Sequence, residues 1–212
     1  MKALASVLVV ACIAGSAQAI TVSSREIGSS AGYQARVNPV YTGQAGPYSA
    51  FAAATGAIGF DDYGATTGDS STVLASLVFV GGVSVAGDTI DLQFYTPSGN
   101  LFNSTALALP QAGNFIWTIT FGAQPDGSDS TFVVPTNGIL QLVASSTSGT
   151  TAGTGRWFLT GTAPVLGTNN AAFGAGSATP VPYQAFSLNA VPTPASLALM
   201  GLGGLVIGRR RR

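Results

Sequence analysis

The sequence predicts an all-β protein, an antiparallel β-sandwich of plain or jelly-roll type, and three observations indicate it. Apolar and polar side chains alternate over Thr89–Tyr95 and again over residues 115–121, which is the two-residue period of half-buried strands. Turn residues separate such segments at intervals of roughly 8–12 residues. Outside the two ends of the chain, no twelve-residue segment shows a helical period. Together these patterns favour many short strands over helices.

The predicted strands follow in chain order, and Gly, Pro, Asn and Asp mark the turns between them. The first is almost uniformly apolar, whereas the others mix apolar and polar residues. Two segments rich in small and hydroxyl residues, 145–155 and 168–179, are expected to be long loops, with O-linked sugar on their hydroxyls as the alternative use. The strands are residues 74–80, 89–95, 101–109, 115–121, 131–134, 139–144, 156–160 and 183–188.

The length of 212 residues suits one domain with a sizeable core, and charged residues are only 8% of the chain. So few charges exclude a highly charged disordered chain. The sequence contains one cysteine and no histidine. This composition removes most side chains on which nucleophilic and metal catalysis depend.

The first 19 residues have the pattern of a helical secretory signal peptide. Met1 and Lys2 form a basic start, residues 3–14 are apolar, and Ala17 and Ala19 occupy the positions that signal peptidase reads. Cleavage after Ala19 is expected, with a buried N-terminal helix as the alternative. A lipobox ending at Cys12 is a further alternative, although the apolar stretch before it is short. Removal of Cys12 would leave an exported chain without disulfides.

The last 22 residues divide into a proline segment, an apolar helix and a basic end. Residues 195–208 carry no charge, and fourteen helical residues reach about 21 Å, less than the ~30 Å hydrocarbon core of a bilayer. The helix is therefore a marginal membrane anchor. The basic end would stay cytoplasmic and leave the body outside the membrane. It consists of Arg209, Arg210, Arg211 and Arg212.

This tripartite tail resembles the PEP-CTERM sorting signal of Gram-negative bacteria. The resemblance covers about 22 residues and rests on Val191, Pro192, Thr193 and Pro194 followed by the apolar and arginine segments. It implies recognition by an exosortase, an integral-membrane enzyme that cleaves near the prolines and releases or re-anchors the protein at the cell surface. Thr193 stands where the family usually has Glu. A plain C-terminal anchor without processing is the alternative.

The expected domains are a signal peptide at 1–19, a β-sandwich at 20–190 and a sorting segment at 191–212. The body between the two ends has three arginines and eight acidic residues, a formal charge of −5. Three scattered arginines cannot form the basic patch that phosphate binding requires, so nucleic acid is not an expected partner.

In the expected mature body, residues 20–190, carboxylates are the side chains that remain available for catalysis. Glycoside hydrolysis needs two carboxyl groups that flank one bond, and Asp61 and Asp62 cannot do so alone because neighbouring strand residues point to opposite faces. We therefore expect no enzyme activity. A carboxylate-based glycosidase or lyase stays the third choice of function.

Six residues are candidates for glycan or calcium contact: Asp61, Asp62, Tyr63, Asp126, Asp129 and Trp157. Carboxylates beside an aromatic ring are typical of a sugar site, and the alternative is a strand end with Phe60 in the core and Asp61 in solvent. Trp157 is interpreted as a surface platform or as a sheet cap. The segment from Asp126 to Asp129 offers oxygen ligands for calcium, but an ordinary turn is preferred and no cofactor is expected.

The expected function is that of an exported structural protein of the cell surface or extracellular matrix. The tail resemblance implies a link to exopolysaccharide and biofilm, a signal peptidase and an exosortase as processing partners, and a transient stay at the inner membrane. A carbohydrate-binding module is the second choice.

Overall fold

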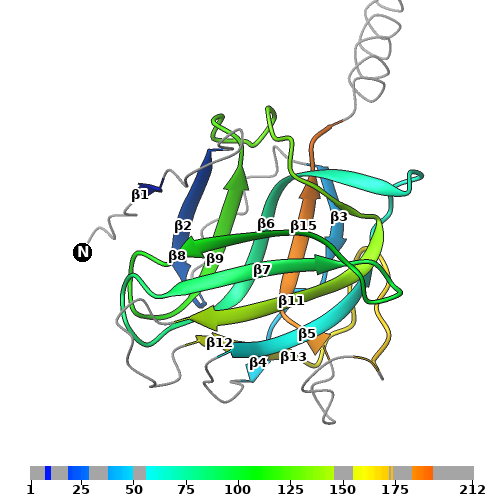
Figure 1. The fold of residues 1–212 in the computed structure, drawn as a ribbon. Helices are drawn as coiled ribbons and strands as arrows, with labels where there is room; N and C mark the ends of the chain where they lie inside the picture. The colour runs from blue at the N-terminus through cyan, green and yellow to red at the C-terminus, as the bar shows by residue number, and fades with distance from the viewer. Residues whose placement is uncertain are drawn as a thin grey trace, which may run out of the picture.

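The computed structural model describes residues 8–10, 19–28, 38–49, 56–145, 155–171, 173 and 183–192, and every regular element within them is a β-strand. All strand pairs are antiparallel. In Figure 1 the strands of one sheet cross in front of those of a second sheet, which gives the two layers of a sandwich. The prediction of an all-β sandwich-like fold is confirmed.

The larger sheet is built around its longest strand, β6 (Ser71–Val83). The path through the sheet is β1 (Leu8–Val10), β2 (Ile20–Glu26), β9 (Gly113–Phe121), β6, β15 (Phe186–Ala190) and β3 (Asn38–Thr42). Two further strands pair with the ends of β6, namely β10 (Val133–Pro135) and β12 (Gly155–Trp157).

The second sheet has four strands in the order β5 (Gly56–Gly64), β11 (Asn137–Ser145), β7 (Thr89–Tyr95) and β8 (Leu101–Ala108). A small third sheet consists of β14 (Tyr183–Gln184), β13 (Leu159–Thr160) and β4 (Tyr48–Ser49). The chain passes from one main sheet to the other between β5 and β6, β6 and β7, and β8 and β9, so neighbouring segments in sequence face each other across the core.

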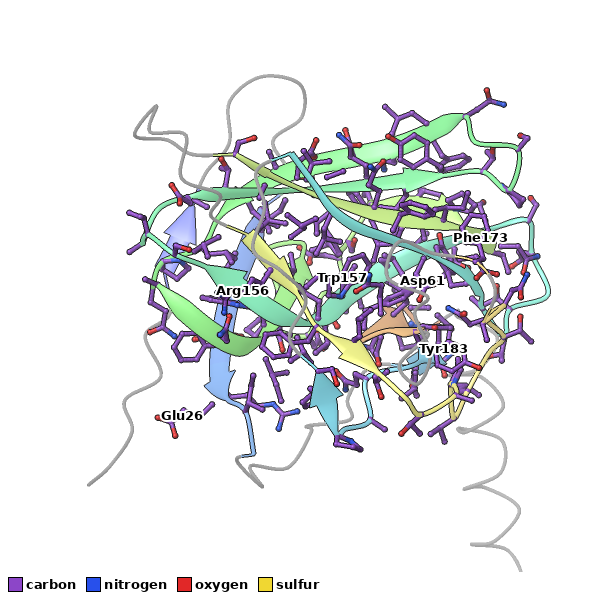
Figure 2. The ribbon with its side chains drawn as sticks, turned by 90° about the horizontal axis from the view of Figure 1, so that it is seen from below. Glu26, Asp61, Arg156, Trp157, Phe173 and Tyr183 are labelled. Atoms are coloured by element: carbon purple, nitrogen blue, oxygen red, sulfur yellow. The ribbon has the colours of Figure 1, made fainter. Side chains whose placement is uncertain are left out.

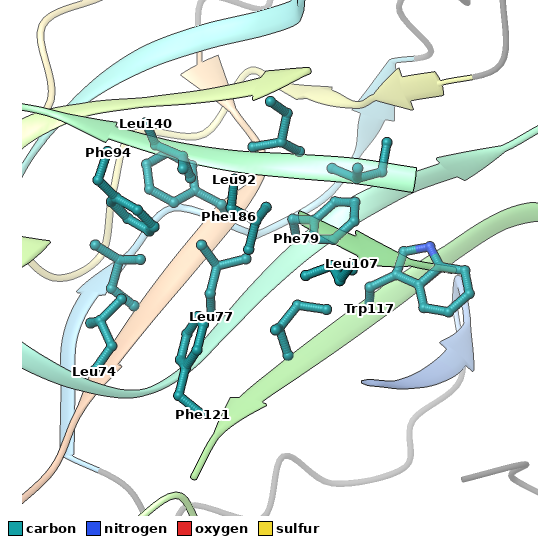
Figure 3. Close-up of a cluster of buried hydrophobic side chains, with 14 of the residues drawn as sticks. Leu74, Leu77, Phe79, Leu92, Phe94, Leu107, Trp117, Phe121, Leu140 and Phe186 are labelled. Atoms are coloured by element: carbon teal, nitrogen blue, oxygen red, sulfur yellow. The ribbon is translucent and has the colours of Figure 1, made fainter. Parts of the chain in front are cut away.

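The core lies between the two main sheets and follows from the two-residue period (Figure 3). Along β7, Ile90, Leu92 and Phe94 are fully buried, while the residues between them are half-buried. On β9, Trp117 is completely buried, as expected from its phase with Phe115. The indole Nε1 of Trp117 donates a hydrogen bond to the carbonyl of Gly81 at 3.0 Å, so its polar atom is satisfied.

The uniformly apolar segment 74–80 is explained by burial on both faces of β6. Leu77 and Phe79 face the main core, whereas Val78 and Val80 belong to a second apolar cluster with Phe158 and Ala185 beside the small sheet. A strand covered on both sides has no polar face, so its sequence does not alternate.

Several predicted strands differ from the observed ones in their bounds. The predicted strand 156–160 is two strands, because Trp157 pairs with β6 and Leu159 pairs with the small sheet. The predicted strand 183–188 is likewise divided into β14 and β15. Strands β2, β3, β4 and β5 were not predicted. Ser interrupts the alternation in β2, Gly and Asp interrupt it in β5, and β3 and β4 are too short to show a clear period.

The predicted helical ends are not part of the described structure, with one exception. Leu8–Val10, within the predicted signal peptide, form strand β1 at the outer edge of β2. Residues 1–7, 11–18 and 193–212 lie outside the described residues, as does most of the two predicted loops. In the described part of the chain, no helix is long and apolar enough to cross a membrane.

We predict that Phe186→Ala destabilises the fold by about 3–5 kcal/mol, because truncating a buried Phe removes apolar contacts and leaves a cavity. The Phe186 ring centroid lies 4.6 Å from that of Tyr41, 5.6 Å from that of Trp157 and 6.2 Å from that of Tyr63. Urea unfolding followed by tryptophan fluorescence measures the change. Phe102→Ala is the control, since Phe102 is 45% exposed and should shift stability by about 0.5 kcal/mol or less. Equal losses in both variants would contradict the central position of Phe186.

Candidate functional site

The acidic segment of β5 lies at one end of the sandwich, close to β14, to residues 166–171 and to Phe173. In Figure 2, Asp61, Phe173 and Tyr183 lie at the same end of the molecule, away from Glu26. Gly64 exchanges two backbone hydrogen bonds with Thr168, of 2.8 and 2.9 Å, which fix the later segment to the end of β5. Residues more than a hundred positions apart in the sequence therefore meet here.

The structure reverses the expected orientation of Phe60 and Asp61. Asp61 is fully buried, whereas Phe60 is partly exposed on the outer face. The pairing with β11 shifts between Leu142 and Val143, so that Ile58 is an extra residue on β5. Beyond this bulge Asp61 lies opposite the buried Leu140 and shares its inward face. The interpretation of Asp61 as a solvated strand end is therefore wrong.

The Asp61 carboxylate connects β5 to the small sheet. Its Oδ2 accepts the backbone N–H of Gln184 at 2.7 Å, and its Oδ1 accepts the N–H of Asp62 at 3.0 Å. Burial raises the pKa of Asp61 to about 7, although the hydrogen bonds from Gln184 and Asn169 act in the opposite direction. Asp61 is therefore a structural carboxyl whose charge is costly in the folded state.

Asp62 points to the opposite face from Asp61, as the strand geometry predicts. Its two carboxylate oxygens accept the backbone N–H of Asn170 at 3.1 and 3.2 Å. Partial burial raises the pKa of Asp62 above its ordinary value. The two carboxyl groups are thus separated by the sheet and do not face one bond.

The two aromatic candidates are core residues, and neither ring forms a surface platform. Tyr63 is 2% exposed, and its hydroxyl donates a hydrogen bond to the carbonyl of Pro135 at 2.9 Å. Trp157 is completely buried, with its Nε1 donating to the carbonyl of Ala185 at 3.2 Å. The surface-platform interpretation of Trp157 is therefore wrong, because the ring belongs to the core.

Asp126 and Asp129 organise a turn. The two carboxylate oxygens of Asp129 accept the backbone N–H groups of Gln124 and Ala123, each at 3.0 Å, and these bonds lower the pKa of Asp129. Asp126 accepts the N–H of Ser128 at 3.0 Å. This geometry agrees with the turn interpretation, because the carboxylates of Asp126 and Asp129 accept backbone N–H groups of their own turn. Among the described residues no group of three or more acidic or cysteine side chains could hold a metal ion.

The outer face of β5 and β11 carries a depression of about 250 Å³. Half-buried Phe173 and Asp62 contribute to its wall, and exposed Asn137 and Thr168 line its rim. The ring of Phe173 meets that of Phe60 edge to face, with centroids 5.6 Å apart. Of the sequence-predicted candidates, Asp62 and Tyr63 line this depression. The other members were missed because they come from segments that the fold alone brings together.

Comparisons with family models, curated proteins and solved structures found no match for this chain.

We predict that Asp61 makes the folded state less stable as the pH rises from about 4 to 7. The folded state holds the Asp61 proton more tightly than the unfolded chain does, whose aspartate pKa is about 3.9, so stability is lost as the pH approaches 7. The expected contribution is about 2–4 kcal/mol. Urea unfolding of wild type and Asp61→Asn across this range should show a smaller decline in the variant.

Asp129→Asn provides a control of opposite sign. Its pKa is lowered in the folded state, so the wild-type advantage over this variant should appear only above about pH 4. If wild type and Asp61→Asn showed parallel pH profiles, the proposed titration of Asp61 would be refuted.

We predict that calcium leaves the melting temperature unchanged. An ion bound only by the folded state at about 100 times its dissociation constant would add about 2.7 kcal/mol and raise Tm by about 5–10 °C. Thermal unfolding in EDTA and in excess calcium chloride should give the same midpoint, because among the described residues no third acidic side chain joins Asp126 and Asp129. A calcium-dependent rise that disappears in Asp129→Asn would place a metal at this turn.

Proposed function

We propose that this chain is an exported structural protein of the cell surface or extracellular matrix in a Gram-negative bacterium. In this proposal the signal peptide is removed after Ala19, and an exosortase-type enzyme cleaves the chain near Pro192 and Pro194. The mature protein is proposed to lie among the polysaccharides of the matrix. Its tail is proposed to stay in the inner membrane only transiently. Residues 195–208 are proposed to be helical before processing.

The observation that carries the proposal is the position of the sandwich relative to the two cleavage sites. The first long strand, β2, begins at Ile20, and the last strand, β15, ends at Ala190. All strands that supply the described core therefore lie between these sites. Strand β1 adds only three residues at an edge of the larger sheet, so cleavage after Ala19 removes no described core residue.

The exit of the chain from the body suits a processing site. The backbone N–H of Val191 donates to the carbonyl of Val73 at 2.9 Å, which is the last described hydrogen bond of this segment to the body. Pro192 has no amide hydrogen, and both residues are partly exposed. An extended segment that starts at the rim of the fold is accessible to a membrane enzyme, whereas β15 itself is buried.

The chemistry of the body supports a structural role over a catalytic one. Asp61 and Asp62 lie on opposite faces of β5, and the Asp129 carboxylate accepts two backbone N–H groups of its own turn. The chain has no histidine, so no imidazole is present to act as a base. We also propose that the sandwich is of the jelly-roll type.

We predict that protein taken from the native cell surface begins at Ile20 and lacks the tail from about Val191 onward. A short apolar helix anchors weakly, and the proline segment offers an extended substrate. Intact mass spectrometry measures both ends directly. Retention of Arg209 to Arg212 on most molecules would refute exosortase processing and show a plain anchor.

Replacing Thr193 by Glu restores the residue usual in the sorting signal and should raise the cleaved fraction wherever cleavage of wild type is incomplete. Thr193→Ala is the matched control and should bring no gain. Equal gains from both variants would contradict recognition of the Glu.

A further inference from the structure

We propose that the depression on the outer face of β5 and β11 binds one unit of a neutral saccharide chain. The site is defined by Asp62, Asn137, Thr168 and Phe173 above Gly64. This inference does not depend on how the tail is processed, so the two proposals can fail separately.

The size and rigidity of the depression suit a single ring. Its volume of about 250 Å³ is below the roughly 300–1,000 Å³ of pockets that enclose a whole small molecule. Gly64 also lines the depression, directly beneath the two polar side chains, since a Cβ there would collide with the Thr168 hydroxyl and lie 2.9 Å from Asn137 Oδ1. The two polar side chains therefore converge over a backbone that the paired hydrogen bonds between Gly64 and Thr168 hold in place.

The polar groups of the site have capacity for a hydroxylated ligand. Asn137 and Thr168 are exposed, and within the described part of the chain their side chains make no hydrogen bond. Asp62 is oriented by the N–H of Asn170, and Asn169 Nδ2 donates to the Asp62 carbonyl at 2.6 Å. A carboxylate oxygen bound by one donor still accepts another. Sugar hydroxyls can donate to Asp62 and exchange bonds with the amide and hydroxyl groups.

The apolar wall supplies the second element of saccharide recognition. Phe173 presents a half-buried ring at the depression, held edge to face against Phe60. Pro97, in the turn between β7 and β8, and Ile139, on β11, extend this apolar surface. The C–H face of a pyranose can pack on such a surface, while its hydroxyl rim meets the polar side chains.

The charge of the site selects neutral chains over acidic ones. Asp62 carries the one carboxyl group among the described residues that line the depression, and the body has a formal charge of −5. The negative charge of Asp62 would repel a uronate carboxylate or a sugar sulfate placed beside it. This repulsion lowers the affinity of the site for acidic chains and makes that affinity depend more strongly on salt.

The test measures binding of the purified mature protein to neutral probes, namely dextran, laminarin, galactomannan and cellohexaose, and to polygalacturonate as the acidic probe. Affinity electrophoresis ranks the polymers, and titration calorimetry gives dissociation constants. We expect binding to at least one neutral probe and at least tenfold weaker binding to polygalacturonate. No binding to any neutral probe, or a preference for polygalacturonate, would overturn the proposal.

The variants Asn137→Ala and Phe173→Ala should each weaken binding of the neutral probe about tenfold or more, the loss expected for one hydrogen bond or one packed ring. Asn114→Ala and Phe102→Ala are matched controls, because both residues are exposed and neither lines the depression. Urea midpoints verify that every variant is folded. If the site variants bind as well as the controls do, the saccharide lies elsewhere and the assignment of this depression is wrong.

The variant Asp62→Asn tests the effect of the negative charge of the site separately from the effect of its shape. Because the amide keeps an acceptor oxygen but removes the negative charge, binding of polygalacturonate should increase while the neutral probe still binds. Unchanged exclusion of polygalacturonate in this variant would refute the electrostatic part of the proposal.

Discussion

The fold depends on apolar burial between the two main sheets, because a chain with a single cysteine has no intramolecular disulfide to hold it. Strand β6 is central to this burial, since it is covered on one face by the main core and on the other by the cluster around Phe158. Phe186 extends the core toward the small sheet through its contacts with Tyr41, Tyr63 and Trp157. These four aromatic rings are therefore part of the core, and any ligand at the surface must contact other residues.

The bulge at Ile58 determines the chemistry at this end of the molecule. It sets the phase of β5, so that Asp61 and Tyr63 face the core and Asp62 faces outward beside Phe60. The buried carboxylate is satisfied by backbone donors from β14 and from its own strand, which offsets part of the cost of removing it from water. The same phase puts a carboxylate next to an aromatic pair on the outer face, where the saccharide proposal locates its ligand.

The structural role and the saccharide site are compatible because they use different parts of the molecule. The tail leaves from the end of β15, while the depression is formed by β5, β11 and the segment after β13. Removal of the tail would therefore leave every residue of the depression in place. A matrix protein with one small sugar subsite would bind a polymer tightly only when several copies of the protein contact the same polymer, as in multivalent binding.

The sequence by itself determined the all-β class and the inward residues of β7, because the two-residue period is local and directly readable from Ile90, Leu92 and Phe94. It also determined the absence of histidine and the order of apolar and basic segments in the tail. It did not determine the side of β5 on which Asp61 lies, since one extra residue at Ile58 inverts the phase of everything after it. The tertiary structure alone decided that Trp157 is buried and that Asn137, Thr168 and Phe173 meet Asp62, because these positions are adjacent only after strands distant in the chain have paired.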